Sequence, residues 1–158
     1  MKRVVLVLVM SVVSLFVFSS YSFAQHGHGG MSTGGMKMET KDVVVEGIKV
    51  SFMVMGNESH KKMLADMKMK EDIEPGSTHN ITVVLKDQKT QKEITDAQIS
   101  MKVVDPKGKD QIKTLKYEGE MKSYDAYFNM PEKGKYQIMV LFKTGDQKKT
   151  AGIYYDVK

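Results

Sequence analysis

Cysteine is absent from this 158-residue chain, and arginine occurs once, as Arg3. Without cysteine the chain can form neither a disulfide nor a thiolate metal site, so its stability must come from packing and backbone pairing. With a single arginine it has almost none of the side chain that binds phosphate or guanine through two parallel hydrogen bonds. We therefore do not expect nucleic acid as a partner.

Features of familiar enzyme sites are missing as well. The sequence has four histidines, and two of them, His26 and His28, lie in a Gly-rich stretch near the N-terminus. It shows no Gly-rich phosphate loop and no serine nucleophile elbow, so no set of nucleophile, base and orienting group can be named. We expect a protein that is not an enzyme.

The longest apolar run is short and lies close to the N-terminus. It follows two basic residues, covers residues 4–18 and precedes small residues at Ser22 and Ala24. A basic start, an apolar stretch of about fifteen residues and small residues before the cut are typical of a secretory signal, whereas a membrane-spanning helix needs about 20 apolar residues. Residues 1–24 are predicted to be a cleavable signal, which directs the chain to the periplasm without stable membrane insertion after cleavage.

Residues 25–41 read QHGHGGMSTGGMKMETK and show no apolar periodicity, which predicts a flexible tail. His26 and His28 form a His-x-His unit that can chelate Cu(II) or Ni(II) beside a free amino terminus. The three methionines of the tail suit Cu(I) in the same way. A solubilising linker is the alternative interpretation.

Residues 42–158 are predicted to form one all-β domain. After residue 24 the chain has 22 basic and 19 acidic side chains, so its charge is nearly balanced. Apolar and polar residues alternate in about seven short segments, separated by turn signals such as Pro75-Gly76. This spacing is typical of an immunoglobulin-like antiparallel β-sandwich, and Gly134-Lys135-Tyr136 ahead of a strand resembles its tyrosine corner.

The first strand is predicted over residues 43–55, with Gly47 as a bend or a bulge. Alternation along it places Met53 and Met55 on the polar face. Large apolar side chains at that end of a strand are either ligands or a surface that the next segment covers. Residues 57–70 show helical spacing, so we expect a short helical or irregular Met-rich excursion after the first strand.

Seven residues in and beside this excursion are candidate metal ligands. Thioether sulfur and imidazole nitrogen are donors that Cu(I) prefers, whereas Mg²⁺ and Ca²⁺ seek oxygen. Thioethers need no deprotonation and cannot be lost to disulfides, which suits an oxidising compartment. For each candidate, packing in or at the rim of the core is the alternative. The candidates are His60, Met63, Met67, Met69, His79, Met53 and Met55, with His26, His28 and Met121 as secondary candidates.

Several stretches resemble the exported YtkA-like or FixH-like β-sandwich domains found in bacterial copper and heavy-metal handling. They are THNITVVL, the stretch around Asp96-Ala97, and FNMPEKGKYQIMVLFK with its Gly134-Lys135-Tyr136. Similar proteins have a Met- and His-rich segment before the strand that begins at Thr78 here. The chain departs from well-known copper carriers because it lacks one compact His…Met…His-x-Met series.

Together these patterns predict an exported protein that binds Cu(I), or Ag(I), through a Met/His site and acts as a carrier or buffer. Neutral ligands favour a monovalent ion and permit transfer, ligand by ligand, to a periplasmic or membrane copper-handling protein. The alternative is a cell-envelope interaction module without metal, in which the methionines form an adaptable apolar surface for a partner.

Overall fold

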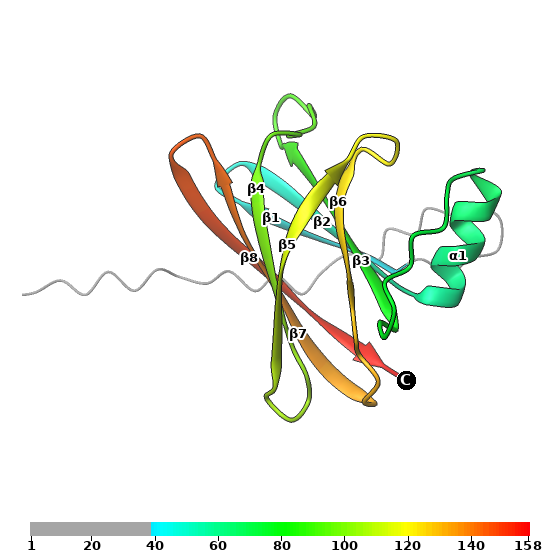
Figure 1. Ribbon diagram of the computed structural model, residues 1–158. Coiled ribbons are helices and arrows are strands. Elements are labelled where there is room, and N and C mark those ends of the chain that lie inside the picture. The colour runs from blue at the N-terminus through cyan, green and yellow to red at the C-terminus, as the bar shows by residue number, and fades with distance from the viewer. Residues whose placement is uncertain (1–38) are drawn as a thin grey trace, which may run out of the picture.

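The computed structural model describes residues 39–158, which form eight strands and one helix (Figure 1). In chain order these are β1 (Glu39–Val45), β2 (Ile48–Gly56), α1 (Asn57–Asp66), β3 (His79–Asp87), β4 (Gln98–Val104), β5 (Asp110–Glu118), β6 (Ser123–Phe128), β7 (Gly134–Thr144) and β8 (Gln147–Val157). The signal predicted for residues 1–24 and the tail up to residue 38 lie outside the described residues, while residues 39–41 belong to β1. No helix within 39–158 is long and apolar enough to cross a bilayer.

The strands follow one another in the order β1-β2-β3-β6-β5-β4-β7-β8, and every neighbouring pair is antiparallel. The sheet folds over on itself, so that β1, β2, β3 and β6 face β4, β7 and β8 across the core (Figure 1). At its two edges β1 approaches β8, where Lys41 Nζ donates a hydrogen bond of 2.6 Å to the carbonyl oxygen of Tyr154. The predicted all-β, antiparallel sandwich is confirmed.

The core consists of the side chains that alternate strands turn inward. Phe52, Ile81, Phe128, Ile138 and Phe142 are all 0% exposed. Each large apolar side chain buried in this way contributes about 1.5–3 kcal/mol to folding. The interior between the two layers is therefore the main source of stability in a chain that has no disulfide.

Residues 43–55 form a hairpin, whereas a single strand was predicted. Glu46 and Gly47 connect β1 to β2, and both have positive φ, at 46° and 79°. Two such residues are the hallmark of a type I′ turn, whose twist matches that of antiparallel strands. Val43 consequently pairs with Val50. The bend expected at Gly47 is thus a full reversal of the chain, and α1 follows the second strand instead of the first.

Two buried tyrosines hold loops to the sandwich. The hydroxyl of Tyr136 accepts a hydrogen bond of 3.0 Å from the backbone N–H of Glu132, which is the tyrosine-corner contact that the sequence predicted. The hydroxyl of Tyr124 accepts from the N–H of Ala97 at 2.9 Å and donates to the carbonyl oxygen of Ile94 at 3.1 Å. These bonds position the segment between β3 and β4 and the turn before β7.

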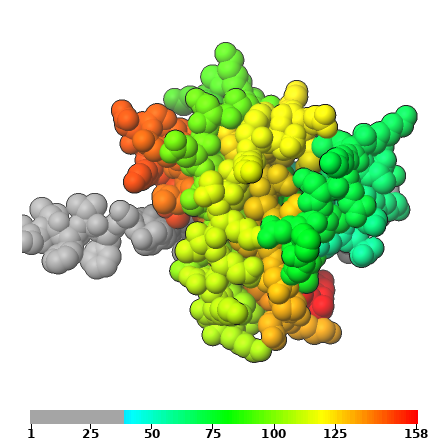
Figure 2. Space-filling model, viewed as in Figure 1, coloured from blue at the N-terminus to red at the C-terminus, as the bar shows by residue number. Residues whose placement is uncertain are grey.

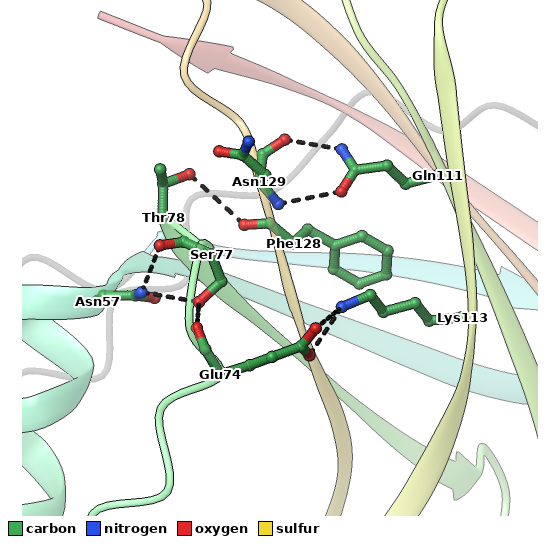
Figure 3. A network of polar contacts seen from close by, with 8 residues as sticks. All are labelled: Asn57, Glu74, Ser77, Thr78, Gln111, Lys113, Phe128 and Asn129. Atoms are coloured by element: carbon green, nitrogen blue, oxygen red, sulfur yellow. Dashed lines mark hydrogen bonds and ion pairs between the residues drawn. The ribbon is translucent and has the colours of Figure 1, made fainter.

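Strands β5 and β6 pair only between Lys116↔Asp125 and Glu118↔Ser123, and then separate. Side chains bridge the resulting gap near the start of β5 (Figure 3). The amide of Gln111 donates to the carbonyl oxygen of Asn129 at 2.7 Å and accepts from its N–H at 3.1 Å, in place of a pair of ladder bonds. Beside it, Lys113 reaches out of β5 towards the segment that follows α1.

Candidate functional site

Strands β2, β3 and β6 bury a second set of side chains on the face turned away from the core, which we call the outer face. Side chains alternate along a strand, so the residues between core positions point there. Met55 lies opposite Asn80, and Asn80 lies opposite Tyr127. In the next row, Thr82 lies between Met53 and Asp125. The first row and Thr82 are buried, so another part of the chain must cover this face.

Helix α1 lies over this face, at the side of the sandwich (Figures 1 and 2). Its two buried residues are His60 and Leu64. His60 is 1% exposed, and its ring meets that of Tyr127 edge-on with 5.5 Å between the ring centroids. The helical spacing predicted from the sequence is confirmed up to Asp66. Met67 follows the last helical residue and is 49% exposed.

The first residue of α1 is tied to the start of β3. Gly56 precedes the helix in an extended conformation, with no side-chain cap. Asn57 donates from its side-chain amide to both the carbonyl oxygen and the hydroxyl of Ser77, at 2.9 Å each (Figure 3). Its backbone N–H donates to the carbonyl oxygen of Thr78 at 2.9 Å. The start of α1 and the end of the segment that leads into β3 are therefore held side by side.

The helix ends in a Schellman motif formed without glycine. Lys68 has a φ of 56°, in the left-handed region. Its N–H donates to the carbonyl oxygen of Ala65 at 3.0 Å, and the N–H of Met69 donates to that of Leu64 at 2.9 Å. These two bonds define the motif, which turns the chain back against the last helical turn. Half-buried Met69 is thereby returned to the neighbourhood of buried Leu64.

A chain of hydrogen bonds connects the polar residues of the outer face. The hydroxyl of Thr82 donates to Asn80 Oδ1 at 2.9 Å, and Asn80 Nδ2 donates to Asp125 Oδ2 at 2.8 Å. The hydroxyl of Tyr127 donates to Asp72 Oδ1 at 3.1 Å, which joins the sheet to the segment after α1. Buried polar groups are costly unless they are paired, so these bonds fix the side chains in one arrangement.

Burial sets the charge state of this site. It lowers the pKa of His60 because the imidazolium loses its hydration, while the carboxylates of Asp125 and Asp72 act in the opposite direction. Burial also raises the pKa of Asp125, against the hydrogen bond from Asn80. A lowered pKa leaves His60 neutral at pH 7. A neutral imidazole has a ring nitrogen with a free lone pair, which is the form that binds metals.

One ring nitrogen of His60 lacks a partner. Among residues 39–158, Nδ1 of His60 is one of four buried side-chain nitrogen or oxygen atoms that make no hydrogen bond. Leaving such an atom unpaired costs about 1–3 kcal/mol, and native proteins rarely do so without a reason. Imidazole nitrogen and thioether sulfur are both donors that a soft cation accepts, so such a cation would be a suitable partner for this atom.

The candidate methionines differ in their placement. Met55 is buried on the outer face, in the row that contains Tyr127, and half-buried Met53 lies one row away. Met63 is half-buried one helical turn after His60, and Met69 is half-buried after the helix. Met67 is the exposed member of the group. The outer face thus brings His60 and Met55 to the same buried layer, with Met53, Met63 and Met69 at its margins.

His79 lies on the other face of the sheet. It precedes Asn80 in β3, and its ring meets that of Tyr155 with 6.2 Å between centroids. Its Nδ1 is 2.9 Å from the hydroxyl of Thr78. Burial lowers the pKa of His79 as well. The strand therefore stands between His79 and His60, and the two rings face different surroundings.

Of the secondary candidates, Met121 is the one that the structure describes, and it is not part of this layer. Met121 is half-buried in the loop between β5 and β6, beyond Ser123, whereas α1 covers the end of β6 that contains Tyr127. His26 and His28 lie outside the described residues.

Sequence reasoning missed the polar residues of the outer face. Asn80 and Thr82 alternate with core residues of β3, and Asp125 and Tyr127 have the same spacing in β6. Alternation alone gives no sign that this side of the strands is buried, because nothing local indicates that a helix will cover it. Within residues 39–158, no three His, Cys, Asp or Glu side chains form a group that could hold a metal ion. A metal proposal for this face therefore depends on methionine.

No protein-family model and no curated protein matches the chain. Among solved structures it is similar to FetP of uropathogenic E. coli, expressed in the periplasm, with a TM-score of 0.58 and 11% identity over 78% of this chain and 97% of FetP. A copper-bound variant of FetP matches with a TM-score of 0.56 and 11% identity, over 77% of this chain and 97% of the variant. A DUF4426 family protein of Pseudomonas aeruginosa matches with a TM-score of 0.54 and 12% identity, over 75% of this chain and 94% of that protein.

At such low identity these likenesses show a shared fold alone. FetP and the DUF4426 protein match over most of their own length, so the likeness covers the whole sandwich and is not confined to one motif. The resemblance to YtkA-like and FixH-like domains stays a prediction.

Proposed function

We propose that this protein is an exported periplasmic carrier or buffer of Cu(I), or of the chemically similar Ag(I), and that it binds the ion on the outer face beneath α1. One observation supports the proposal above all others. His60 is buried with an unpaired ring nitrogen, in the layer that also contains the buried thioether of Met55. The copper-bound state of FetP, which has the same fold, supports it independently.

The donor set suits a soft monovalent cation. His60 supplies a neutral nitrogen, and Met55 supplies sulfur, with Met53, Met63 and Met69 as further thioethers within the same excursion and strand end. None of these groups must lose a proton before it binds. The nearby carboxylate of Asp125 offsets the single positive charge of Cu(I) in a buried layer, where an uncompensated charge is costly. Neutral, exchangeable ligands suit transfer to another copper-handling protein better than catalysis.

The test is a Cu(I) titration of the exported protein, without oxygen, in competition with a chromophoric Cu(I) chelator. Met55→Leu keeps the apolar volume and removes the sulfur, and His60→Phe keeps a ring on Tyr127 and removes both nitrogens. We expect each variant to lose at least about tenfold in affinity, since each removes one soft ligand. Met101→Leu is the matched control, because Met101 is 0% exposed in the core.

Two results would refute the site. In the first, wild-type protein fails to compete with the chelator. In the second, Met55→Leu and His60→Phe bind Cu(I) as tightly as Met101→Leu does.

The exposure of Met67 favours a second candidate function. This side chain is 49% exposed next to half-buried Met63 and Met69, so the end of α1 presents an adaptable apolar surface. A partner protein that binds there would be lost on Met67→Asp, while Cu(I) affinity would stay the same. A variant that loses Cu(I) affinity and still binds the partner identifies a residue of the metal site. A variant that loses the partner and still binds Cu(I) identifies a residue of the interaction surface.

A further inference from the structure

The segment that follows α1 crosses the outer face with little backbone support. Residues 69–78 contain no helix or strand. Within residues 39–158, the backbone of residues 70–73 makes no hydrogen bond to other backbone groups. Segments that rely on side chains open more easily than ladders do, because few bonds must break at once. We call residues 57–76, which comprise α1 and this segment, the cover.

Two side-chain contacts, which we call the latches, hold the cover to the sandwich. In the first, the hydroxyl of Tyr127 in β6 donates to Asp72 at 3.1 Å. In the second, Nζ of Lys113 in β5 lies 2.7 Å from both carboxylate oxygens of Glu74 (Figure 3). Lys113 also lies over the ring of Phe128, 5.5 Å from its centroid. Both latches join the last part of the cover to strands far away in sequence.

The two ends of the cover are joined to each other. The side chain of Asn57 donates to Ser77, and the hydroxyl of Ser77 donates to the carbonyl oxygen of Glu74 at 2.6 Å (Figure 3). Gly56 lies at one end in an extended conformation, and Gly76 lies at the other with a φ of 80°. With the two latches broken, the packing of buried His60 and Leu64 in α1 would be left to hold the cover against the sheet. The cover would therefore open more easily about a fixed base, without loss of the strands.

The ligands proposed above are divided between the cover and the sheet. His60, Met63 and Met69 belong to the cover, whereas Met53 and Met55 belong to β2. We propose that the cover is a latched gate, and that its opening separates the two halves of the ligand set and so releases Cu(I). This inference rests on the proposed function for its ligand, while the latches rest on the contacts alone. In the closed state the ion has donors from both sides, and in the open state it keeps the donors of one side alone.

The experiment compares three variants of the exported protein. Lys113→Met removes the charge and keeps an aliphatic stem over Phe128, and Tyr127→Phe removes the hydroxyl and keeps the ring that contacts His60. Lys107→Met is the matched control. Lys107 lies in the turn before β5, and its substitution breaks a 2.8 Å ion pair with Glu132, which precedes β7. Amide hydrogen exchange of residues 61–69, whose N–H groups are hydrogen-bonded within α1 and the motif that ends it, is measured without metal. The rate of Cu(I) release is measured with an excess of chelator.

We expect exchange in residues 61–69 and Cu(I) release to become about three- to fivefold faster in Lys113→Met, in line with the value of a well-formed ion pair. Tyr127→Phe should accelerate both further, since hydrogen bonds to charged groups contribute more. Lys107→Met should change neither. Faster exchange with unchanged release would overturn the gate, and unchanged exchange in both latch variants would overturn the latches.

The outcome also separates this inference from the proposed function. A wild-type chain that takes up no Cu(I) overturns the copper proposal and the gate with it. Exchange in the metal-free protein then still decides whether the latches exist.

Discussion

The two faces of the layer formed by β2, β3 and β6 come from the same strands and differ in their chemistry. On the inner face, Phe52 and Ile81 are 0% exposed and meet only the core. On the outer face, Asn80 is 0% and His60 1% exposed, but their neighbours are carboxylates, hydroxyls and thioethers. Both faces thus contain fully buried side chains, and on one of them these side chains are polar.

The two faces affect the stability of this small domain in different ways. Apolar burial stabilises a protein without any special geometry, whereas polar burial costs free energy until each atom is paired. The outer face meets that condition for Asn80, Thr82 and Asp125 and fails it at His60. An arrangement that gives up stability in this way is where a ligand is to be sought.

The largest effect should come from the inner face. Phe52→Ala removes a fully buried ring from the core, and we expect the free energy of unfolding to fall by about 3–5 kcal/mol. Urea denaturation followed by circular dichroism measures this change. A loss of under about 1 kcal/mol would mean that the inner face is not the main source of stability.

A smaller effect should come from the outer face. Asn80→Ala removes the donor to Asp125 and the acceptor for Thr82 at once. Because both partners then lack a bond, we expect a loss of about 1–3 kcal/mol by the same measurement. Asn129→Ala is the matched control, since Asn129 bonds to Gln111 through its backbone alone. Equal stability of the two variants would contradict a structural role for the polar network.

Acid should weaken the protein through both described histidines. Burial lowers the pKa of His60 and of His79, so below the ordinary value of about 6.5 the unfolded chain binds protons that the folded chain does not. The free energy of unfolding should therefore fall as the pH falls below this value, by at most about 1.4 kcal/mol per pH unit for each histidine. Denaturation of the metal-free protein between pH 7.5 and 5 measures the slope. His60→Phe and His79→Phe should each flatten it, and a slope that neither changes would show that other groups cause it.

The inner face was predictable from the sequence to a greater extent than the outer face. Alternation identified Phe52, Ile81 and Val83 as core, because period-2 patterns depend only on a strand with one buried side. The hairpin at Glu46 was missed, because a non-glycine residue rarely adopts positive φ and no Asn-Gly signal marks the turn. The short helix was predicted from its stripe, but its end at Asp66 was missed. The left-handed residue that follows the helix end is usually glycine, and here it is Lys68.

The outer face was hidden for a different reason. Asn80 and Asp125 are buried only because α1 folds back over them, and no local pattern encodes that contact between elements. The methionines and His60 were named as candidate ligands from their donor atoms alone. Where each of them lies depends on strand register, which placed Met55 in the row of Asn80 and Tyr127 and His79 on the other face of the sheet. Composition therefore predicted the kind of ligand, and only the fold could show which donors share a face.

The variant with the smallest expected effect tests most directly whether the two faces act separately. His79→Phe keeps a ring against Tyr155 and removes the nitrogens on the inner side of the strand. Because β3 separates His79 from the outer face, we expect Cu(I) affinity to stay within about twofold of wild type, against at least about tenfold loss for His60→Phe. The same chelator competition measures both. A loss in His79→Phe as large as in His60→Phe would mean that the two faces do not act separately, and that the ion is bound at the end of the sandwich where both histidines can be reached.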